Sequence, residues 1–206
     1  RSIAIPSERE EAFRALSRRR HQLTDSIRRV KQRIRSLFLA LGVAEPAGID
    51  SWGKAAVLAI EHQPLSAGAT ETRDSLLSEL KYFIIAQKEV DTKLELLAKE
   101  QDEAIRIAAM RSVPGVGRVV ATTFAAEIFN PKRFNHSKEV TAYLGLAPIV
   151  QQSGASKGKA NSSPSRSTEA TKLAGGGSMV PQKAIAALAR KLAALLWKLS
   201  LPVETA

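Results

Sequence analysis

The feature that most constrains this chain is a long run of apolar residues spaced three and four positions apart. The run spans residues 13–41 and lapses only at Arg20. That spacing places the apolar side chains on one stripe of an α-helix and is typical of a coiled-coil seam. Ser7 with Glu10 three residues later predicts a capping box at the helix start, and Gly42 predicts its end. We therefore expect one helix of about 35 residues, about 50 Å long at 1.5 Å per residue.

A second seam with the same spacing runs from Leu76 to Ala108. Between the seams, residues 42–70 concentrate glycine and proline around one short apolar stretch, which indicates a connector with a small helix. Two long amphipathic helices joined by a connector bury their stripes by folding back on each other. The sequence therefore predicts a mainly α protein in which residues 1–110 form a long antiparallel helical hairpin, or coiled coil. Because a hairpin has a thin core, we expect a homo-oligomer, with packing onto a further domain as the alternative.

Positive charge is concentrated at both ends of the sequence. Residues 1–41 carry 11 Lys and Arg against 4 Asp and Glu, residues 42–110 carry 7 against 12, and residues 111–206 carry 13 against 4. Each Lys or Arg that contacts a phosphate releases a counterion and adds salt-sensitive affinity. The distribution therefore favours DNA or RNA as a partner. Charge pairing across the hairpin is the alternative.

Composition excludes several classes of site. The chain has no cysteine and only three histidines, so we expect neither disulfides nor a metal site, and a reducing, cytoplasmic location fits best. No apolar run reaches the roughly 18 to 20 residues that span a bilayer, so no membrane partner is expected. The sequence begins at Arg1, without a methionine, and its first residues look like the middle of a sequence pattern. We therefore expect it to be a fragment of a longer protein.

The pattern changes in the stretch RSVPGVGRVVATTFAAEI, which opens a predicted small helical domain over residues 111–152. Pro114, Gly115 and Gly117 permit a tight turn between two helices and a close approach of backbone to a ligand. The turn resembles the helix-hairpin-helix motif, in which amides at the start of the second helix hold a DNA phosphate without reading sequence. Arg118, in the first turn of that helix, adds positive charge. A plain helix-helix turn is the alternative.

The last third of the chain divides into three predicted parts. A short helix capped by Asn135 or Ser137 should end at Gly145. Residues 153–180 are rich in Ser, Gly, Ala and Lys without an apolar period, so we expect them to be disordered. Residues 181–200 begin with proline and form an amphipathic pattern, which predicts a terminal helix. We expect this helix to pack on the hairpin domain, with a membrane-surface role as the alternative.

Several stretches, taken together in this order, resemble a known family. They are the first predicted helix, then SVPGVGRVVATTFAAEI, RFNHSKEVTAYLGLAP and QQSG. Over residues 3–157 and the last helix, the chain resembles insertion-sequence transposases of the insertion sequence 110/116/902 family. That family includes bridge-RNA-guided recombinases and pilin-gene invertases. The resemblance implies that Ser153 of QQSG is the nucleophile that attacks DNA. Gly154, Lys157 and Lys159 would let the phosphate backbone lie close to it.

The same resemblance implies partners and a cofactor. In the family an N-terminal acidic domain holds divalent metal, so Mg²⁺ is implied in the complete enzyme, held by a domain missing from this chain. DNA is the implied partner, with a guide (bridge) RNA as a further one. Alone, the chain should bind nucleic acid and self-associate without cutting DNA.

Two departures from the family keep other readings open. The acidic residues form no metal cluster in the transposase portion, and a Ser-rich, GGGS-bearing segment follows QQSG where the family continues with a basic stretch. A truncated or decayed copy would explain both. The alternatives from other classes are a non-catalytic nucleic-acid-binding or architectural protein, in which Ser153 is idle, and an interaction module built on the coiled coil.

Overall fold

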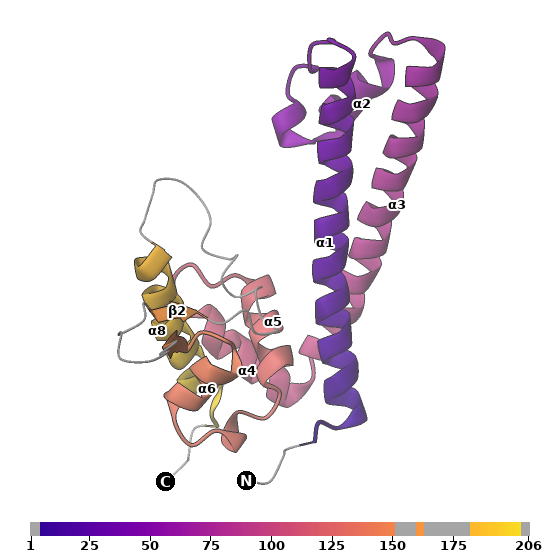
Figure 1. Cartoon of the computed structure of the whole chain (residues 1–206). Helices are drawn as coiled ribbons and strands as arrows, with labels where there is room; N and C mark the ends of the chain where they lie inside the picture. Colours follow the sequence, from indigo (N-terminus) through magenta and orange to yellow (C-terminus); the bar gives the residue numbers. More distant parts are fainter. Residues whose placement is uncertain (1–4, 151–159, 163–181, 203–206) are drawn as a thin grey trace. The chain divides into compact units, whose positions relative to one another are not determined.

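A computed structural model describes residues 5–150, 160–162 and 182–202 of the chain. As predicted, the protein is mainly helical (Figure 1). It divides into two compact units: a hairpin unit, Ala15–Leu97, and a small helical unit that combines residues up to Arg14 with those from Ala98 onward. The elements in chain order are α1 (Glu8–Ala40), η1 (Ile49–Ser51), α2 (Lys54–His62), α3 (Ala67–Ala98), α4 (Gln101–Arg111), α5 (Arg118–Ile128), η2 (Pro131–Arg133), α6 (Ser137–Tyr143), β1 (Pro148–Val150), β2 (Ala160–Ser162) and α8 (Gln182–Ser200).

The first long helix begins and ends where the sequence predicts. At its start the Ser7 amide donates to Glu10 Oε2 at 2.7 Å and the Glu10 amide donates to Ser7 Oγ at 3.3 Å, which is a capping box. At its end Gly42 has φ +64°, and the Val43 amide donates back to the Phe38 carbonyl at 3.0 Å. This left-handed glycine satisfies a carbonyl of the last turn, as in a Schellman motif. Both ends of α1 are therefore set by local side-chain and backbone chemistry.

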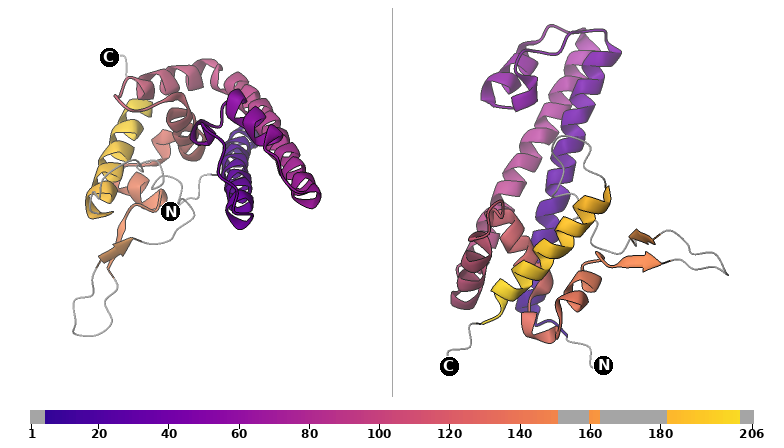
Figure 2. Two further views of the ribbon diagram at one scale, coloured as in Figure 1. Left: turned by 90° about the horizontal axis from the view of Figure 1, so that it is seen from above. Right: turned by 90° about the vertical axis from the view of Figure 1, so that its left-hand side faces the viewer.

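In the hairpin unit, α1 and α3 run antiparallel (Figure 2). Arg20 Nε donates to Asp91 Oδ1 at 2.5 Å, and Arg33 pairs with both carboxylate oxygens of Glu79 at 3.0 Å. Later residues of α1 thus meet earlier residues of α3. Arg20 is also the position at which the apolar seam lapses, and its ion pair explains how a charged residue is accommodated there.

The hairpin core lies toward the connector. Val30, Ile34, Phe38, Leu77 and Leu80 from the two long helices are buried together with two connector residues, Ile49 of η1 and Ile60 of α2. The connector was expected to hold one small helix, and the structure adds the 3₁₀ turn η1. Because its apolar residues complete the core, the connector is part of the hairpin's packing.

The second seam is divided between two helices. The sequence predicted one helix continuing to Ala108, whereas α3 ends at Ala98 and α4 begins at Gln101. Glu100 has an extended backbone with φ −62° and ψ 142° at this break. Apolar spacing alone does not distinguish one long helix from two successive helices, because both keep the same period. The residues of α4 belong to the small helical unit.

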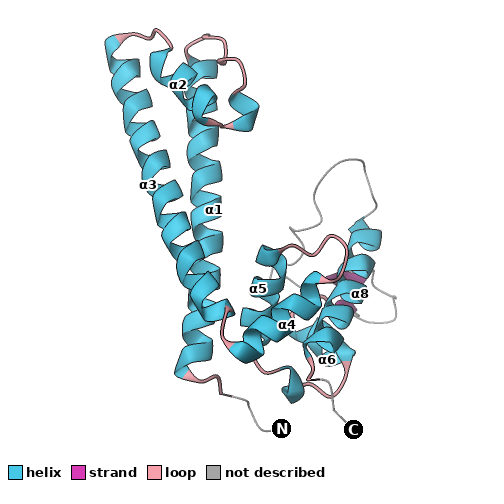
Figure 3. Ribbon diagram, turned by 180° about the vertical axis from the view of Figure 1, so that it is seen from behind, coloured by secondary structure: helices cyan, strands magenta, loops and turns pink. Residues whose placement is uncertain are grey.

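The small helical unit is built around α8, with α4, α5 and α6 in contact with it (Figure 3). Its fully buried side chains come from each of these helices and include Met110, Ile128, Val140 and Leu196. The helices α5 and α6 have the predicted positions, and Gly145 follows α6 with φ +70°. Among the described residues, none of the helices has the length and apolar character that crossing a membrane requires.

A two-stranded ribbon was not predicted. Strands β1 and β2 pair antiparallel, with Pro148 opposite Ser162 and Val150 opposite Ala160. Strand β2 falls inside residues 153–180, for which the sequence predicted no regular structure. Three-residue strands carry too few positions for an alternating pattern to be read from a single sequence.

A charged cluster joins the start of α1 to α4 within the small helical unit. Arg9 and Glu100 form an ion pair at 2.5 Å, and Arg106 Nη1 donates to Glu103 Oε1 at 3.2 Å. Glu103 is 9% exposed, and its Oε2 has no hydrogen-bond partner among the described residues. Burial raises the pKa of Glu103, although Arg106 and Arg9 oppose the shift. The cluster therefore holds a carboxylate that is costly to ionise.

Replacing Ile34 with alanine should destabilise the hairpin unit by about 2 to 5 kcal/mol, because Ile34 is 0% exposed and its loss leaves a cavity. Leu39→Ala is the matched control on the same helix, since Leu39 is 83% exposed and should change stability by less than about 0.5 kcal/mol. Helical circular dichroism during urea unfolding measures both variants. Equal effects from the two would contradict the assigned packing of α1.

Replacing Glu103 with glutamine should remove a pH dependence of stability. Because the pKa of folded Glu103 is raised, folding binds a proton, so wild-type stability falls as pH rises from the usual value near 4.5 through the folded value. The stability of Glu103→Gln relative to wild type should therefore increase across that window. Urea unfolding at a series of pH values tests this, with exposed Glu100→Gln as control. A difference that is constant with pH would refute the assignment.

Candidate nucleic-acid interface

The turn between α4 and α5 is tight and internally bonded. The Ser112 amide and hydroxyl both donate to the Ala109 carbonyl, at 3.3 and 2.8 Å, and end α4. The Val116 amide then donates to the Val113 carbonyl at 3.0 Å. Gly115 has φ +84°, a conformation that side chains other than glycine rarely adopt. Of the two glycines in the turn, Gly115 is therefore the one that the backbone conformation requires.

Gly117 is required by neither backbone angle nor packing. It is the N-cap of α5 with φ −79° and ψ 173°, which any residue adopts, and it provides no side-chain cap. A Cβ built on it would meet no atom within 4 Å. The first amides of a helix have no intrahelical acceptor, and Ser, Thr, Asn or Asp at the N-cap would normally supply one. Glycine here leaves space in front of the helix end.

The surface of the turn is open. Pro114, Gly115, Gly117 and Arg118 are all exposed, whereas Val116 is 6% exposed and fixes the turn to the unit's core. The four residues predicted to contact phosphate therefore lie on one short exposed segment. The start of α5 also carries the positive end of the helix dipole, which attracts anions. Phosphate contact by these residues stays a prediction.

A cation-aromatic cluster organises the segment that follows α5. The Arg133 guanidinium lies 4.1 Å from the ring centroid of Phe129, 4.3 Å from that of Phe134 and 4.2 Å from that of Tyr143. Such contacts are stabilising where the cation is partly desolvated. The cluster joins η2 to the end of α6. It explains physically why the Arg-Phe pair and the later tyrosine, both quoted in the family resemblance, occur together.

Helix α8 is fastened to the same segment by two hydrogen bonds. Trp197 Nε1 donates to the Pro131 carbonyl at 2.9 Å, and Arg190 Nε donates to the Leu146 carbonyl at 2.5 Å. Trp197 is buried at 7% exposure. The predicted terminal helix therefore packs on the helical domain and holds the chain just before β1.

The predicted catalytic residue lies outside the described residues. Ser153, Gly154, Lys157 and Lys159 all fall in residues 151–159, between β1 and β2 in the sequence. Their assignment as nucleophile and backbone-contacting residues stays a prediction. Sequence reasoning did not identify the residues that fasten η2, α6 and α8 to one another, Arg133, Arg190 and Trp197. The Arg-Phe pair was a signal for the first, whereas the other two carried none.

The acidic residues that the structure describes in the small helical unit pair mainly with arginines. Within the described ranges, no group of three or more His, Asp or Glu side chains could hold one. Three of the unit's carboxylates face arginines instead: Glu127 lies 3.8 Å from Arg14, and Glu100 and Glu103 pair with Arg9 and Arg106. These carboxylates balance guanidinium groups, those of Arg14 and Arg106 being largely buried, so no metal-dependent step is derived from them.

Comparison with known proteins identifies the matched segment. Residues 107–171 match the profile of the transposase IS116/IS110/IS902 family. A putative transposase, y4qE, of Sinorhizobium fredii (strain NBRC 101917 / NGR234) is 26% identical over 153 residues, 74% of this chain and 36% of that protein. The transposase for insertion sequence element IS1111A of Coxiella burnetii (strain RSA 493 / Nine Mile phase I) is 25% identical over 147 residues, 70% of this chain and 40% of that protein.

The chain thus spans less than half the length of these two relatives. The matched segment contains the exposed α4–α5 turn, the Arg133 cluster and the QQSG motif. It thus holds three of the four stretches on which the family resemblance was based, all but the first predicted helix, and the resemblance is confirmed. Residues 107–171 are therefore similar to the corresponding part of IS116/IS110/IS902-family transposases.

Proposed function

We propose that this chain is the DNA-binding and serine-bearing portion of a transposase that acts in DNA transposition. The observation that carries the proposal is the open, uncapped start of α5 at Gly117, inside the family-matched segment. If the turn served only to join two helices, a capping side chain of the protein itself would be expected to accept hydrogen bonds from these amides. An exposed glycine at this position is better explained by a ligand that approaches the backbone.

A DNA phosphate is the ligand that suits this helix start. Backbone amides and the helix dipole together favour an anion at the N-terminus of α5. Arg118 is exposed in the first turn of that helix, and Arg111 is exposed at the end of α4. Two guanidinium groups on either side of the turn add sequence-independent attraction for a phosphate backbone. The binding predicted is therefore strong in low salt and insensitive to base sequence.

Ser153 supplies the proposed chemistry. A serine hydroxyl can attack a phosphodiester, forming an Oγ–phosphorus bond as one strand end leaves, but it is a weak nucleophile until its proton is removed. Such activation is expected from the complete protein. The Mg²⁺ that the family implies would be held by a domain other than the described part of this chain, in which no group of three or more His, Asp or Glu side chains could hold it. A guide RNA enters the proposal as a further partner of the complete protein.

An interaction module is the second candidate function, and exposed apolar side chains of α3 favour it. Tyr82 and Ile85 are 63% and 60% exposed and lie on one face of the helix. Exposed apolar side chains of this kind suit self-association of the hairpin. A salt titration separates the two candidates. A DNA-binding portion should bind duplex with an affinity that falls steeply as salt rises, whereas an interaction module should not.

Gly117→Val should weaken duplex binding without unfolding the chain. Valine fits the backbone angles, and its Cβ would meet no atom within 4 Å, but the side chain fills the space in front of the α5 amides. Loss of charge-assisted hydrogen bonds worth about 1.5 to 3 kcal/mol should lower affinity about tenfold or more. Fluorescence anisotropy with a short labelled duplex measures the change. Gly68→Val is the matched control, since Gly68 also has free space around its Cβ.

In the same titration Arg118→Ala should reduce the dependence of log affinity on log salt by about 0.9, the contribution of one phosphate contact. Unchanged affinity for Gly117→Val would remove the proposed phosphate site. Circular dichroism of each variant establishes that the fold is retained.

Ser153→Ala should abolish strand exchange in a protein completed with the family's acidic domain and supplied with Mg²⁺. The expected loss is complete because the alanine has no oxygen to bond to phosphorus. Ser156→Ala, three residues later in the same stretch, is the control and should stay active. Electrophoresis of a labelled substrate reports both products and protein-linked strands. Equal activity of Ser153→Ala and wild type would exclude Ser153 as the nucleophile.

A further inference from the structure

The hairpin unit contains a pocket that the proposed transposase chemistry does not use. It has a volume of about 370 Å³ and lies between α1 and the connector that carries η1. Small-molecule sites in proteins are commonly about 300 to 1,000 Å³. The polar and aromatic side chains of its lining are Thr24, Arg28, Lys31, Gln32, Arg35, Asp50 and Trp52. All of them belong to the hairpin unit, so the pocket is complete within that unit.

The aromatic wall of the pocket is Trp52, which closes η1. Its backbone has φ +49° and ψ 27°, a left-handed conformation that bulky residues rarely adopt. The side chain is half-buried and packs against the hairpin core. Lys31 Nζ lies 5.2 Å from the centroid of the indole ring. The fold therefore holds a flat aromatic surface in place beside a cation.

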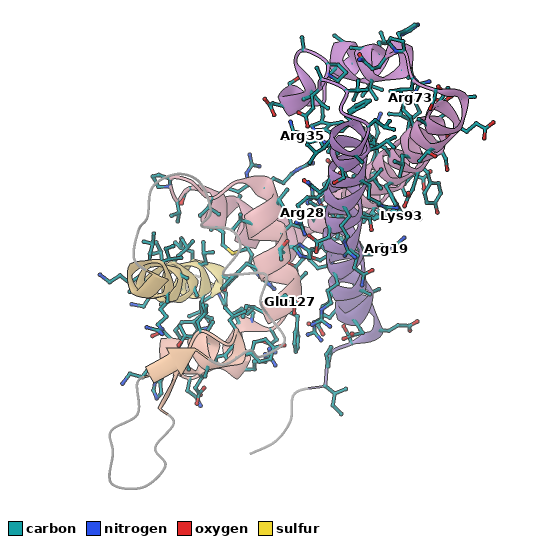
Figure 4. All side chains as sticks on the ribbon, turned by 45° about the horizontal axis from the view of Figure 1, so that its top comes forward. Arg19, Arg28, Arg35, Arg73, Lys93 and Glu127 are labelled. Atoms are coloured by element: carbon teal, nitrogen blue, oxygen red, sulfur yellow. The ribbon has the colours of Figure 1, made fainter. Side chains whose placement is uncertain are left out.

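The charges of the lining are unequally paired. Arg35 pairs with Asp50 and lies 3.7 Å from Glu45, so it is neutralised by the connector. Arg28 and Arg35 project from the same side of α1, seven residues apart (Figure 4). Arg28 is 72% exposed in its side chain, and its contact with Asp25 is long at 3.4 Å. Arg28 is thus available to a further anion.

Lys31 is the least satisfied cation of the pocket. No carboxylate of the described residues forms an ion pair with it, and its ammonium group lies over the face of Trp52. Burial lowers the pKa of Lys31, which means that its ammonium group has lost part of its hydration without gaining an anion. A bound anion would restore that interaction. The pocket therefore offers two cations and one aromatic face to a single ligand.

We propose that this pocket binds an unpaired nucleotide, with the base against Trp52 and the phosphate between Lys31 and Arg28. Stacking of a base on an aromatic side chain combined with a basic groove is how proteins hold single strands. On binding, the base takes the place of the Lys31 ammonium over the indole, and the ammonium moves to the phosphate. An acidic peptide would use the two cations but leave the indole without a partner. The site goes beyond the proposed function, since the α5 amides serve duplex phosphates.

Tryptophan fluorescence of the full chain tests this directly, because the protein has only two tryptophans, Trp52 and Trp197. Trp197→Phe leaves Trp52 as the reporter. A short oligothymidylate should quench this fluorescence saturably, and thymidine 5′-monophosphate should do so more weakly, which separates a strand from a free nucleotide. In Trp52→Phe the remaining Trp197 signal should not respond. An abasic phosphodiester chain that quenches equally would overturn the stacking.

Substitutions of the cations complete the test. Lys31→Ala and Arg28→Ala should each weaken oligothymidylate binding at least about fivefold and lower the salt dependence by about 0.7, the value for one phosphate of a single strand. Arg29→Ala, an exposed neighbour outside the lining, should leave the quenching amplitude unchanged. Absence of Trp52 quenching by either probe, or quenching unaffected by both cation variants, would overturn the proposal. Gly117→Val should not alter Trp52 quenching. A failure of the proposed duplex site at α5 can therefore be distinguished from a failure of the nucleotide pocket.

Discussion

The burial of one apolar stripe on each of two long helices is the interaction on which the hairpin depends. Two helices alone enclose little volume, so each stripe has only one partner face. The structure compensates at the connector, where Ile49 and Ile60 join Ile34 and Phe38 in one core. A consequence is that the connector is held rigidly enough to impose an unusual backbone on Trp52. The same packing that stabilises the hairpin therefore builds the aromatic wall of its pocket.

Under the two proposals, the two units would offer nucleic acid different kinds of surface. The small helical unit presents backbone at the start of α5, where glycine leaves the amides accessible. That surface can recognise only what all phosphates share. The hairpin unit presents side chains, an indole beside Lys31 and Arg28, which suit a base with its phosphate. A protein that handles both paired and unpaired DNA during transposition would use each kind, and the two proposals stand on separate observations.

Much of the fold follows from local sequence rules, because those rules act over a few residues. The capping box at Ser7, the glycine stop at Gly42 and the start of α5 after Gly117 each depend on near neighbours. The break at Glu100 could not be predicted, since the apolar period continues through it. Likewise, Arg133, Arg190 and Trp197 act on partners that only the tertiary fold brings near. Candidate site residues were predictable where a motif is local, as at the α4–α5 turn, and not where a site is assembled, as at Trp52.

The Arg133 cluster restricts which sequences can keep this fold. A guanidinium group is flat and weakly hydrated, so it can lie against Phe129, Phe134 and Tyr143 at once. Lysine would keep the charge but would bring a compact, strongly hydrated ammonium group among three rings. Replacement of arginine by lysine is usually tolerated on protein surfaces, but at position 133 it would disrupt the contact between η2 and α6. Sequences that keep this fold should therefore retain arginine at position 133, and a substitution there would have to be accompanied by replacement of the aromatic rings around it.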